Sequence, residues 1–381
     1  MEVFRGNLKI YYSLLCFTGL WPYNNSVVIK IYRLAIMLIL CGCIANQLST
    51  IGNTKITLNE IITQISFGCT LFLYISRYFT TIITFPSIRY VFDSMEEDYV
   101  ALKNSIELEL LMKDLVTAKH IIQAYFVMTC AGIVCLFISL GLPTFFETDI
   151  QLRLLRLLGF FYTDRSSQSD LSCWSIIVAV SYGLLTVSCT EGTISVCATY
   201  FSGLLEIATY RMRTAVNKVA NSDTINVIDL RPVVEIHLRA IQHSKKYTDD
   251  VMLTSLMIMI VVVVAFGVHI YRLYIYITEE GEYDEILITS YFVLAYLAFI
   301  CGNNYSGQIL LDNSIKLYQE TYNSLWYRIP PKMQKMVLIA LIKSQTAVEF
   351  NLAGLFTPCY EGFTMMMSSS FSYFTLLCSV Q

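Results

Sequence analysis

Seven long apolar runs follow one another along the chain, separated by more polar segments. They cover residues 27–48, 61–85, 121–142, 172–198, 251–276, 286–311 and 355–380. A helix needs roughly 20 apolar residues to cross about 30 Å of hydrocarbon, and each run reaches that length. The pattern predicts an all-α, polytopic membrane protein with seven transmembrane helices.

Three amphipathic segments extend this pattern beyond the apolar runs. Apolar positions recur at helical spacing after the fourth run, at Leu204, Ile207 and Ala208, which predicts that its helix continues. Pro232 begins a second segment that leads into the fifth run, and Pro330-Pro331 begins a third. These segments could lie separately on a membrane surface. We favour one packed bundle, because all three are expected on the same side.

Composition supports the membrane assignment. Of the 381 residues, 55% are hydrophobic and 14% are charged, whereas a soluble domain carries nearer a quarter charged residues. A net charge of −3 without any Lys/Arg-rich block argues against a nucleic-acid partner. The sequence has no CxxC pair, no His-Glu-x-x-His spacing and no nucleotide-binding glycine loop. We therefore expect no metal site, no cofactor and no enzymatic activity.

The basic residues predict the orientation. Most Lys and Arg lie before the first run and in the segments after the second, fourth and sixth runs, and cytoplasmic segments are enriched in these residues. The N-terminus is therefore expected inside and the C-terminus outside. This topology opposes a G-protein-coupled receptor, which also needs an Asp-Arg-Tyr and an Asn-Pro-x-x-Tyr that the third and last runs lack. A secondary transporter is disfavoured because seven spans do not divide into two halves.

Several short motifs resemble those of the insect odorant receptor family. Ahead of the first run stands Gly19-Leu20-Trp21-Pro22, and after the sixth stands Tyr322-Asn323-Ser324-Leu325-Trp326-Tyr327. Lys343-Ser344-Gln345 is similar to the family's basic-Ser-Gln signature. The chain closes with Ser370-Phe371-Ser372-Tyr373-Phe374-Thr375, close to the family's terminal motif. It departs from the family pattern at Thr346-Ala347, where Lys-Pro is usual, and at Phe371, where Tyr is usual.

The resemblance implies an odorant-gated, non-selective cation channel subunit. Such a subunit binds a small volatile ligand and forms a tetramer with an obligate co-receptor in the plasma membrane of olfactory neuron dendrites. It also implies a cytoplasmic segment over 1–26, six spans with a ligand pocket in their outer half over 27–311, a cytoplasmic anchor over 312–350, and a pore-lining seventh helix over 351–381. A gustatory receptor channel of the same superfamily is the alternative.

Within that framework, two sets of residues are candidates for function. Tyr373, Leu377 and Gln381 stand four apart and share one helix face, so we expect them to line the pore, with Leu377 as a hydrophobic gate. The alternative is that this face packs on a neighbouring helix. The ligand-pocket candidates are apolar or aromatic side chains with a few hydroxyls, which suit a small apolar ligand with one polar group. They are Leu71, Phe72, Tyr74, Ile133, Phe137, Ile177, Ser181, Tyr291 and Ala295.

Charged residues at two places need separate interpretation. Glu279, Glu280, Glu282, Asp284 and Glu285 form an acidic segment before the sixth run. It could concentrate cations near a pore mouth, although a solvated loop is the simpler interpretation. Arg77 and Glu191 lie inside the second and fourth runs. Each side chain can reach the membrane interface, so we expect both to be structural.

Overall fold

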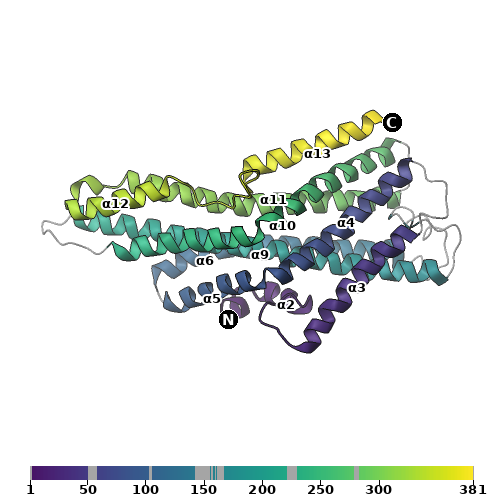
Figure 1. Ribbon diagram of the computed structural model, residues 1–381, viewed down its shortest axis with the longest axis horizontal. Coiled ribbons are helices and arrows are strands. Elements are labelled where there is room, and N and C mark those ends of the chain that lie inside the picture. The colour runs from purple at the N-terminus through teal and green to yellow at the C-terminus, as the bar shows by residue number, and fades with distance from the viewer. Residues whose placement is uncertain are drawn as a thin grey trace.

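The computed structural model describes residues 2–49, 58–102, 105–141, 155, 158, 160, 167–220, 230–278 and 283–380. Throughout these residues the regular elements are helices, which confirms the all-α prediction (Figure 1). They are α1 (Glu2–Gly6), α2 (Lys9–Phe17), α3 (Val27–Ser49), α4 (Leu58–Ile83), α5 (Phe85–Ala101), α6 (Ile106–Leu136), η2 (Phe137–Gly141), α9 (Ser167–Ala220), α10 (Arg231–Thr278), α11 (Tyr283–Tyr322), η3 (Trp326–Arg328), α12 (Pro331–Ser344) and α13 (Tyr360–Val380).

Each of the seven predicted spans coincides largely with one helix. Five helical stretches are long and apolar enough to cross a membrane unaided: α3, α6 with η2, α9, α10 and α11. The second span is long and apolar enough only when α4 is taken together with α5. The two helices are joined by a bend of 62°. Within the described residues α13 is not apolar enough, because serine and threonine recur along its length. Several membrane-spanning helices are therefore present.

Two predicted boundaries differ from the structure. The second span was expected to continue to Phe85, but α4 ends at Ile83 and Pro86 occupies the first turn of α5. A proline in that position lacks the N–H of a continuing helix and favours a new start. The seventh span was expected from Leu355, yet α13 begins at Tyr360. Residues 346–359 form an irregular segment in which Leu352 and Phe356 make an isolated bridge.

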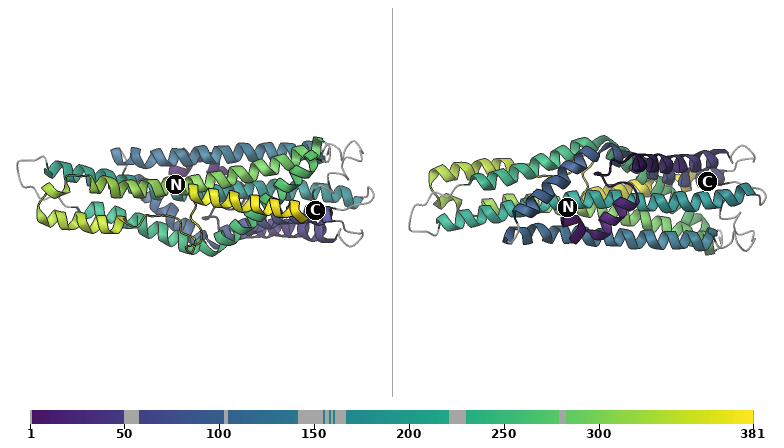
Figure 2. Two further views of the ribbon diagram at one scale, coloured as in Figure 1. Left: turned by 90° about the horizontal axis from the view of Figure 1, so that it is seen from above. Right: turned by 90° about the horizontal axis from the view of Figure 1, so that it is seen from below.

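Helix α9 is the centre of the molecule. Its 54 residues correspond to about 80 Å at 1.5 Å per residue, far more than a bilayer requires. It packs against α6, α11, α10 and α4, and Figure 2 shows these helices running along the long axis of the molecule. Much of its length is buried inside the chain itself.

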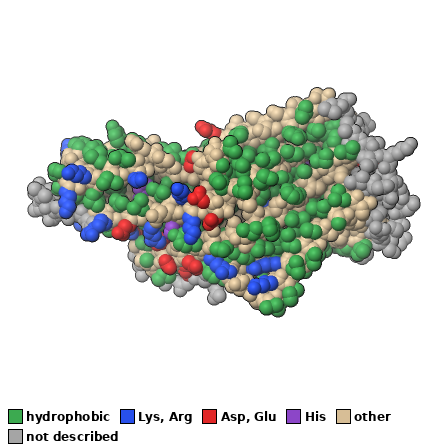
Figure 3. Space-filling model, in the orientation of Figure 1, with side chains coloured by type: hydrophobic (Ala, Val, Ile, Leu, Met, Phe, Trp, Pro, Cys, Tyr) green, Lys and Arg blue, Asp and Glu red, His purple; other side chains and the backbone are tan. Residues whose placement is uncertain are grey.

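The α12 end of the molecule has a core of its own, as predicted for the three amphipathic segments. Met212 and Val216 from α9, Val233 from α10, and Met333 and Val337 from α12 are buried in one cluster. Figure 3 shows charged side chains gathered over this half, whereas hydrophobic side chains cover the half that carries α13. The three segments thus pack together as a bundle, and the alternative of separate surface helices is wrong.

The Gly-Leu-Trp-Pro motif forms a buried corner between α2 and α3. Gly19 adopts φ +71°, a conformation that favours glycine, and its carbonyl accepts a 2.7 Å hydrogen bond from Nε of Arg33. Trp21 packs edge-on against Phe4 and Tyr12. The motif therefore fixes the direction in which the chain enters α3.

Candidate functional site

A small pocket lies between α4, α9 and α11. Its wall is apolar and aromatic, with hydroxyl groups supplied by threonine and tyrosine. We call it the aromatic pocket, and it is lined by Thr70, Leu73, Tyr74, Leu184, Val187, Phe292, Ala295, Tyr296 and Phe299. Its composition fits a small apolar ligand with one polar group.

One cluster of polar atoms lies beside this pocket. Thr70 Oγ1 lies 3.0 Å from the Tyr296 hydroxyl and 3.2 Å from Nε2 of His269. All three side chains are buried. These groups pair with one another and form one polar cluster behind the apolar wall of the pocket.

The predicted ligand residues divide between this pocket and other places. Tyr74 and Ala295 line the aromatic pocket. Leu71 and Ile177 belong to the buried core, and Ile133 is half-buried on α6. Ser181 has a buried hydroxyl without a hydrogen-bond partner among the described residues.

Three further predicted residues lie outside the aromatic pocket. The Tyr291 hydroxyl donates to the carbonyl of Met128 at 3.2 Å. Phe72 and Phe137 are 50% and 45% exposed, so they lie on the outer surface of the bundle and not in this pocket. In a membrane protein that surface faces lipid, which is why large apolar side chains are stable there.

Sequence reasoning missed Thr70, Leu73, Leu184, Val187, Phe292, Tyr296 and Phe299. A helical signal could have found most of them, since residues three or four apart share a face. Starting from Tyr74, that rule leads to Thr70. From Ala295 it leads to Phe292 and Phe299.

A tyrosine packed on a glycine shapes one wall of the aromatic pocket. A Cβ added at Gly183 on α9 would come within 2.0 Å of the Tyr74 ring. Only a residue without a side chain lets α4 and α9 approach this closely. Gly132 receives the Tyr291 ring in the same way.

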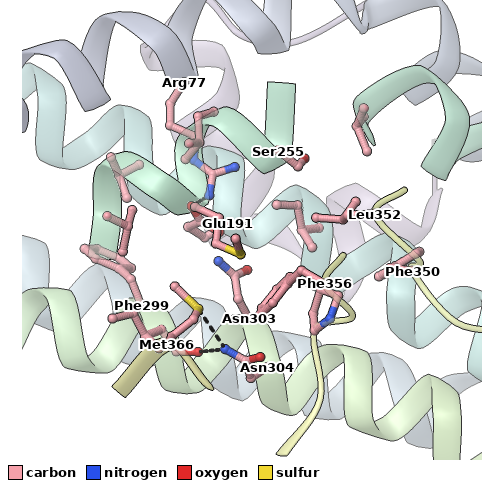
Figure 4. Close-up of a pocket in the computed structure, with 18 of the residues that line it drawn as sticks. Arg77, Glu191, Ser255, Phe299, Asn303, Asn304, Phe350, Leu352, Phe356 and Met366 are labelled. Carbon is pink, nitrogen blue, oxygen red and sulfur yellow. Dashed lines mark hydrogen bonds and ion pairs between the residues drawn. The ribbon is translucent and has the colours of Figure 1, made fainter. Parts of the chain in front are cut away.

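A second, larger pocket adjoins the first. It encloses about 870 Å³ of empty space, counting the part open to solvent, between α4, α9, α10, α11 and the segment leading into α13. Leu73, Val187, Tyr296 and Phe299 line both pockets. We call this one the ion-pair pocket, because Arg77 and Glu191 form part of its wall (Figure 4).

From the sequence, Arg77 and Glu191 were each expected to reach a membrane interface. In the structure they bind each other instead. Nη2 of Arg77 lies 2.5 Å from Oε1 of Glu191, and the side chains are only 12% and 3% exposed. The pair joins α4 to α9 in the interior of the bundle. Burial becomes tolerable because each charge offsets the other.

Within the described residues, helix α13 packs on α10, with a smaller contact to α11. Ser370 donates to the carbonyl of Val263 at 3.2 Å, and Gly267 on α10 allows the α13 backbone to come close. The opposite side carries exposed polar residues at helical spacing. This polar face consists of Glu361, Thr364, Ser368, Ser372, Thr375 and Ser379.

The predicted pore residues lie away from this polar face. Tyr373 is partly exposed, whereas Leu377 is half-buried and packs against a cluster that contains Val268 and Tyr271 of α10. Gln381 lies outside the described residues, as do Glu279, Glu280 and Glu282 of the acidic segment. The assignment of Leu377 as a gate stays a prediction.

Comparisons with known proteins agree with the motifs. The family model "7tm Odorant receptor" matches residues 57–371. The chain is 19% identical over 183 residues to Odorant receptor 10 of Aedes albopictus, covering 47% of this chain and 48% of that protein. The match thus spans about half the length of this curated relative.

Solved structures show the same fold. The olfactory receptor OR5 of Machilis hrabei in complex with eugenol superposes with a TM-score of 0.81, over 99% of this chain and 98% of that one. The structure of the same receptor described without eugenol gives 0.80 over the same shares. At 11% identity, these two matches establish the architecture alone.

Proposed function

The chain belongs to the odorant receptor family, and on that premise we propose that it is an odorant-gated, non-selective cation channel subunit. The aromatic pocket is the observation that carries this proposal. It lies between three helices, its wall is apolar, and the Thr70 and Tyr296 side chains that line it pair their hydroxyls with each other. A volatile molecule is small and mostly apolar, so its chemistry matches the apolar wall of this pocket.

The membrane setting of the proposal follows from the helices. We place the chain in the plasma membrane of olfactory neuron dendrites, as a multi-pass protein with the N-terminus inside and the C-terminus outside. The positive-inside rule supports this orientation, since basic side chains gather over the half that carries α12. The spans 27–311 then hold the ligand, and 312–350 anchors the subunit in the cytoplasm.

The proposed pore is lined by α13, within the segment 351–381, in a tetramer that includes the co-receptor. Within the described part of the chain, α13 packs on α10 and α11, and its polar face is exposed. Hydroxyl groups along a helix replace part of an ion's hydration shell as it passes. The family match favours this odorant receptor assignment over a gustatory receptor.

Expression with and without the co-receptor tests the proposal. We expect a panel of volatiles to evoke cation current only when both chains are present. The current should persist in excised patches with G-protein cycling blocked. Loss of all current under that block would identify a metabotropic receptor instead.

A variant connects the current to the aromatic pocket. Ala295→Phe fills the pocket with a ring, so the response should disappear although the protein still reaches the surface. Phe72→Leu, on the outer surface, is the matched control and should respond normally. An unchanged response of Ala295→Phe would place the ligand elsewhere.

A further inference from the structure

The ion-pair pocket has chemistry that the aromatic pocket lacks. Most of its wall is apolar, with side chains such as Met259, Val262 and Phe356. Among its polar groups, Asn303 faces Arg77 and Glu191 (Figure 4). An amphiphilic space of this kind can orient a ligand that has a polar head and an apolar body.

Three polar atoms at this place have no hydrogen-bond partner among the described residues. They are Oε2 of Glu191, Oδ1 of Asn303 and Nε of Arg77, and all three are buried. Two of the three are acceptors. Buried polar atoms are nearly always paired in folded proteins, with protein, water or ligand. A bound molecule that donates hydrogen bonds would therefore satisfy the free acceptor atoms of Glu191 and Asn303.

The charge balance narrows the class of occupant. Arg77 already neutralises Glu191 at 2.5 Å, so an anion would compete with Glu191 for the guanidinium, and a cation would compete with Arg77 for the carboxylate. A neutral hydroxyl disrupts neither charge. It can donate to Glu191 or Asn303, while its apolar body contacts the methionine and phenylalanine side chains.

We propose that the ion-pair pocket is a second ligand site, which takes a small neutral molecule with a hydroxyl group, an alcohol or a phenol. It is distinct from the aromatic pocket, although Leu73, Val187, Tyr296 and Phe299 form a shared wall. Phe356 and Pro358 precede α13, and Met366 lies on it. An occupant therefore contacts the base of α13 directly.

Photolabelling of the purified full-length protein in lipid nanodiscs tests the site without any need for channel activity. The probe is an octanol that carries a diazirine, and its matched control has a methyl group in place of the hydroxyl. Adducts are mapped by peptide mass spectrometry. We expect the hydroxyl probe to label the peptides that contain Met259 and Met366 about tenfold more than the methyl probe, as a hydrogen bond to a charged group allows.

Variants assign the preference to the polar groups. Asn303→Leu keeps the ion pair but removes one acceptor, so the hydroxyl preference should fall several-fold. Arg77→Met combined with Glu191→Met removes both charges at once, which avoids an unpaired buried charge. It should abolish the preference, while labelling by the methyl probe persists and shows that the pocket is intact. If the double variant does not fold, Asn303→Leu still decides the outcome.

Two further results would overturn the proposal. Equal labelling by the two probes would mean that water, and not the hydroxyl of the probe, hydrogen-bonds to Arg77, Glu191 and Asn303. Labelling that is confined to peptides of the aromatic pocket, or that is lost in Ala295→Leu, would mean that the probe binds in the aromatic pocket alone. Because the labelling experiment measures no current, a negative result does not contradict the proposal of an odorant-gated channel. In the same way, a failure of the channel proposal does not contradict this ligand site.

Discussion

Tyr74 sets the shape of the aromatic pocket through its packing on one glycine. Its ring is buried against the bare backbone at Gly183 and forms part of the aromatic pocket. Since the ring fills the space that any side chain at 183 would need, the two positions determine the pocket wall together.

Gly183→Ala should therefore change the odorant response. The new Cβ would lie 2.0 Å from a ring carbon of Tyr74, so the ring has to move, and overpacking of this kind costs about 1–3 kcal/mol. We expect the concentration of odorant for half-maximal current to shift about tenfold or more. Gly42→Ala is the control, because nothing lies within 4 Å of that position. Equal dose–response curves for the two variants would contradict the role of Tyr74.

The polar cluster of Thr70, Tyr296 and His269 supports a second prediction at this scale. Thr70→Val removes the hydroxyl that Tyr296 and His269 share, and a buried polar group left unpaired costs about 1–3 kcal/mol. Responses to volatiles with a polar group should weaken more than responses to hydrocarbons, while Thr70→Ser should keep both. A uniform loss across the panel would indicate a packing defect. Currents from a matched alcohol and alkane series measure the difference.

The sequence predicted the pocket helices better than the pocket residues, for a physical reason. A soluble helix shows its buried side by periodicity, but a membrane helix is apolar on the lipid side as well. Phe72 and Tyr74 therefore look equivalent in the sequence, although one is exposed and the other buried. The pairing of Arg77 with Glu191 was missed although both lie near the same end of their predicted spans, because nothing in the sequence shows that α4 packs against α9.

At the scale of the element, α13 combines a packed side with a free side. Its existence was predicted, whereas its late start at Tyr360 was not. Asn304 explains part of that start, because its Oδ1 accepts a hydrogen bond from the N–H of Cys359 at 3.2 Å. A contact with a helix that is distant in the sequence leaves no signal in the residues around Tyr360.

Two adjacent leucines on α13 distinguish the packed side from the free side. Leu376 is 56% exposed beside the polar face, whereas Leu377 is half-buried toward α10. If the free side lines the pore, Leu376→Ser should wet the constriction, which raises leak current and alters cation selectivity. Leu377→Ser should mainly reduce surface expression. Whole-cell recording with surface labelling measures both, and the reverse result would establish the Tyr373, Leu377 and Gln381 face as the lining.

In the proposed topology the whole molecule extends well past the membrane at its α12 end, where α12 has apolar residues on two sides. One side is buried with Met333 and Val337, while Leu338, Ile339 and Ile342 stay exposed. An exposed apolar patch outside the hydrocarbon indicates a protein contact. We expect this patch to join subunits in the proposed tetramer.

Replacing Ile339 and Ile342 by glutamate tests that contact. The charges should prevent association, because a desolvated carboxylate without a partner opposes binding. Single-molecule photobleaching would then count fewer subunits per complex than in the unaltered receptor. Lys332→Glu changes the charge of α12 at an exposed site and serves as the control. A full complement of subunits in the double variant would move the contact elsewhere.

Orientation is the last property that belongs to the whole molecule. Basic residues gather over the half with α12, and α13 ends at the opposite end of the long axis (Figure 1). The positive-inside rule then places the α12 half in the cytoplasm and the C-terminus outside. An epitope appended after Gln381 should bind antibody on intact cells, whereas one placed before Met1 should bind only after permeabilisation. Opposite labelling would put α12 outside, where it could not join subunits in the cytoplasm, and would remove the basis of the proposed anchor.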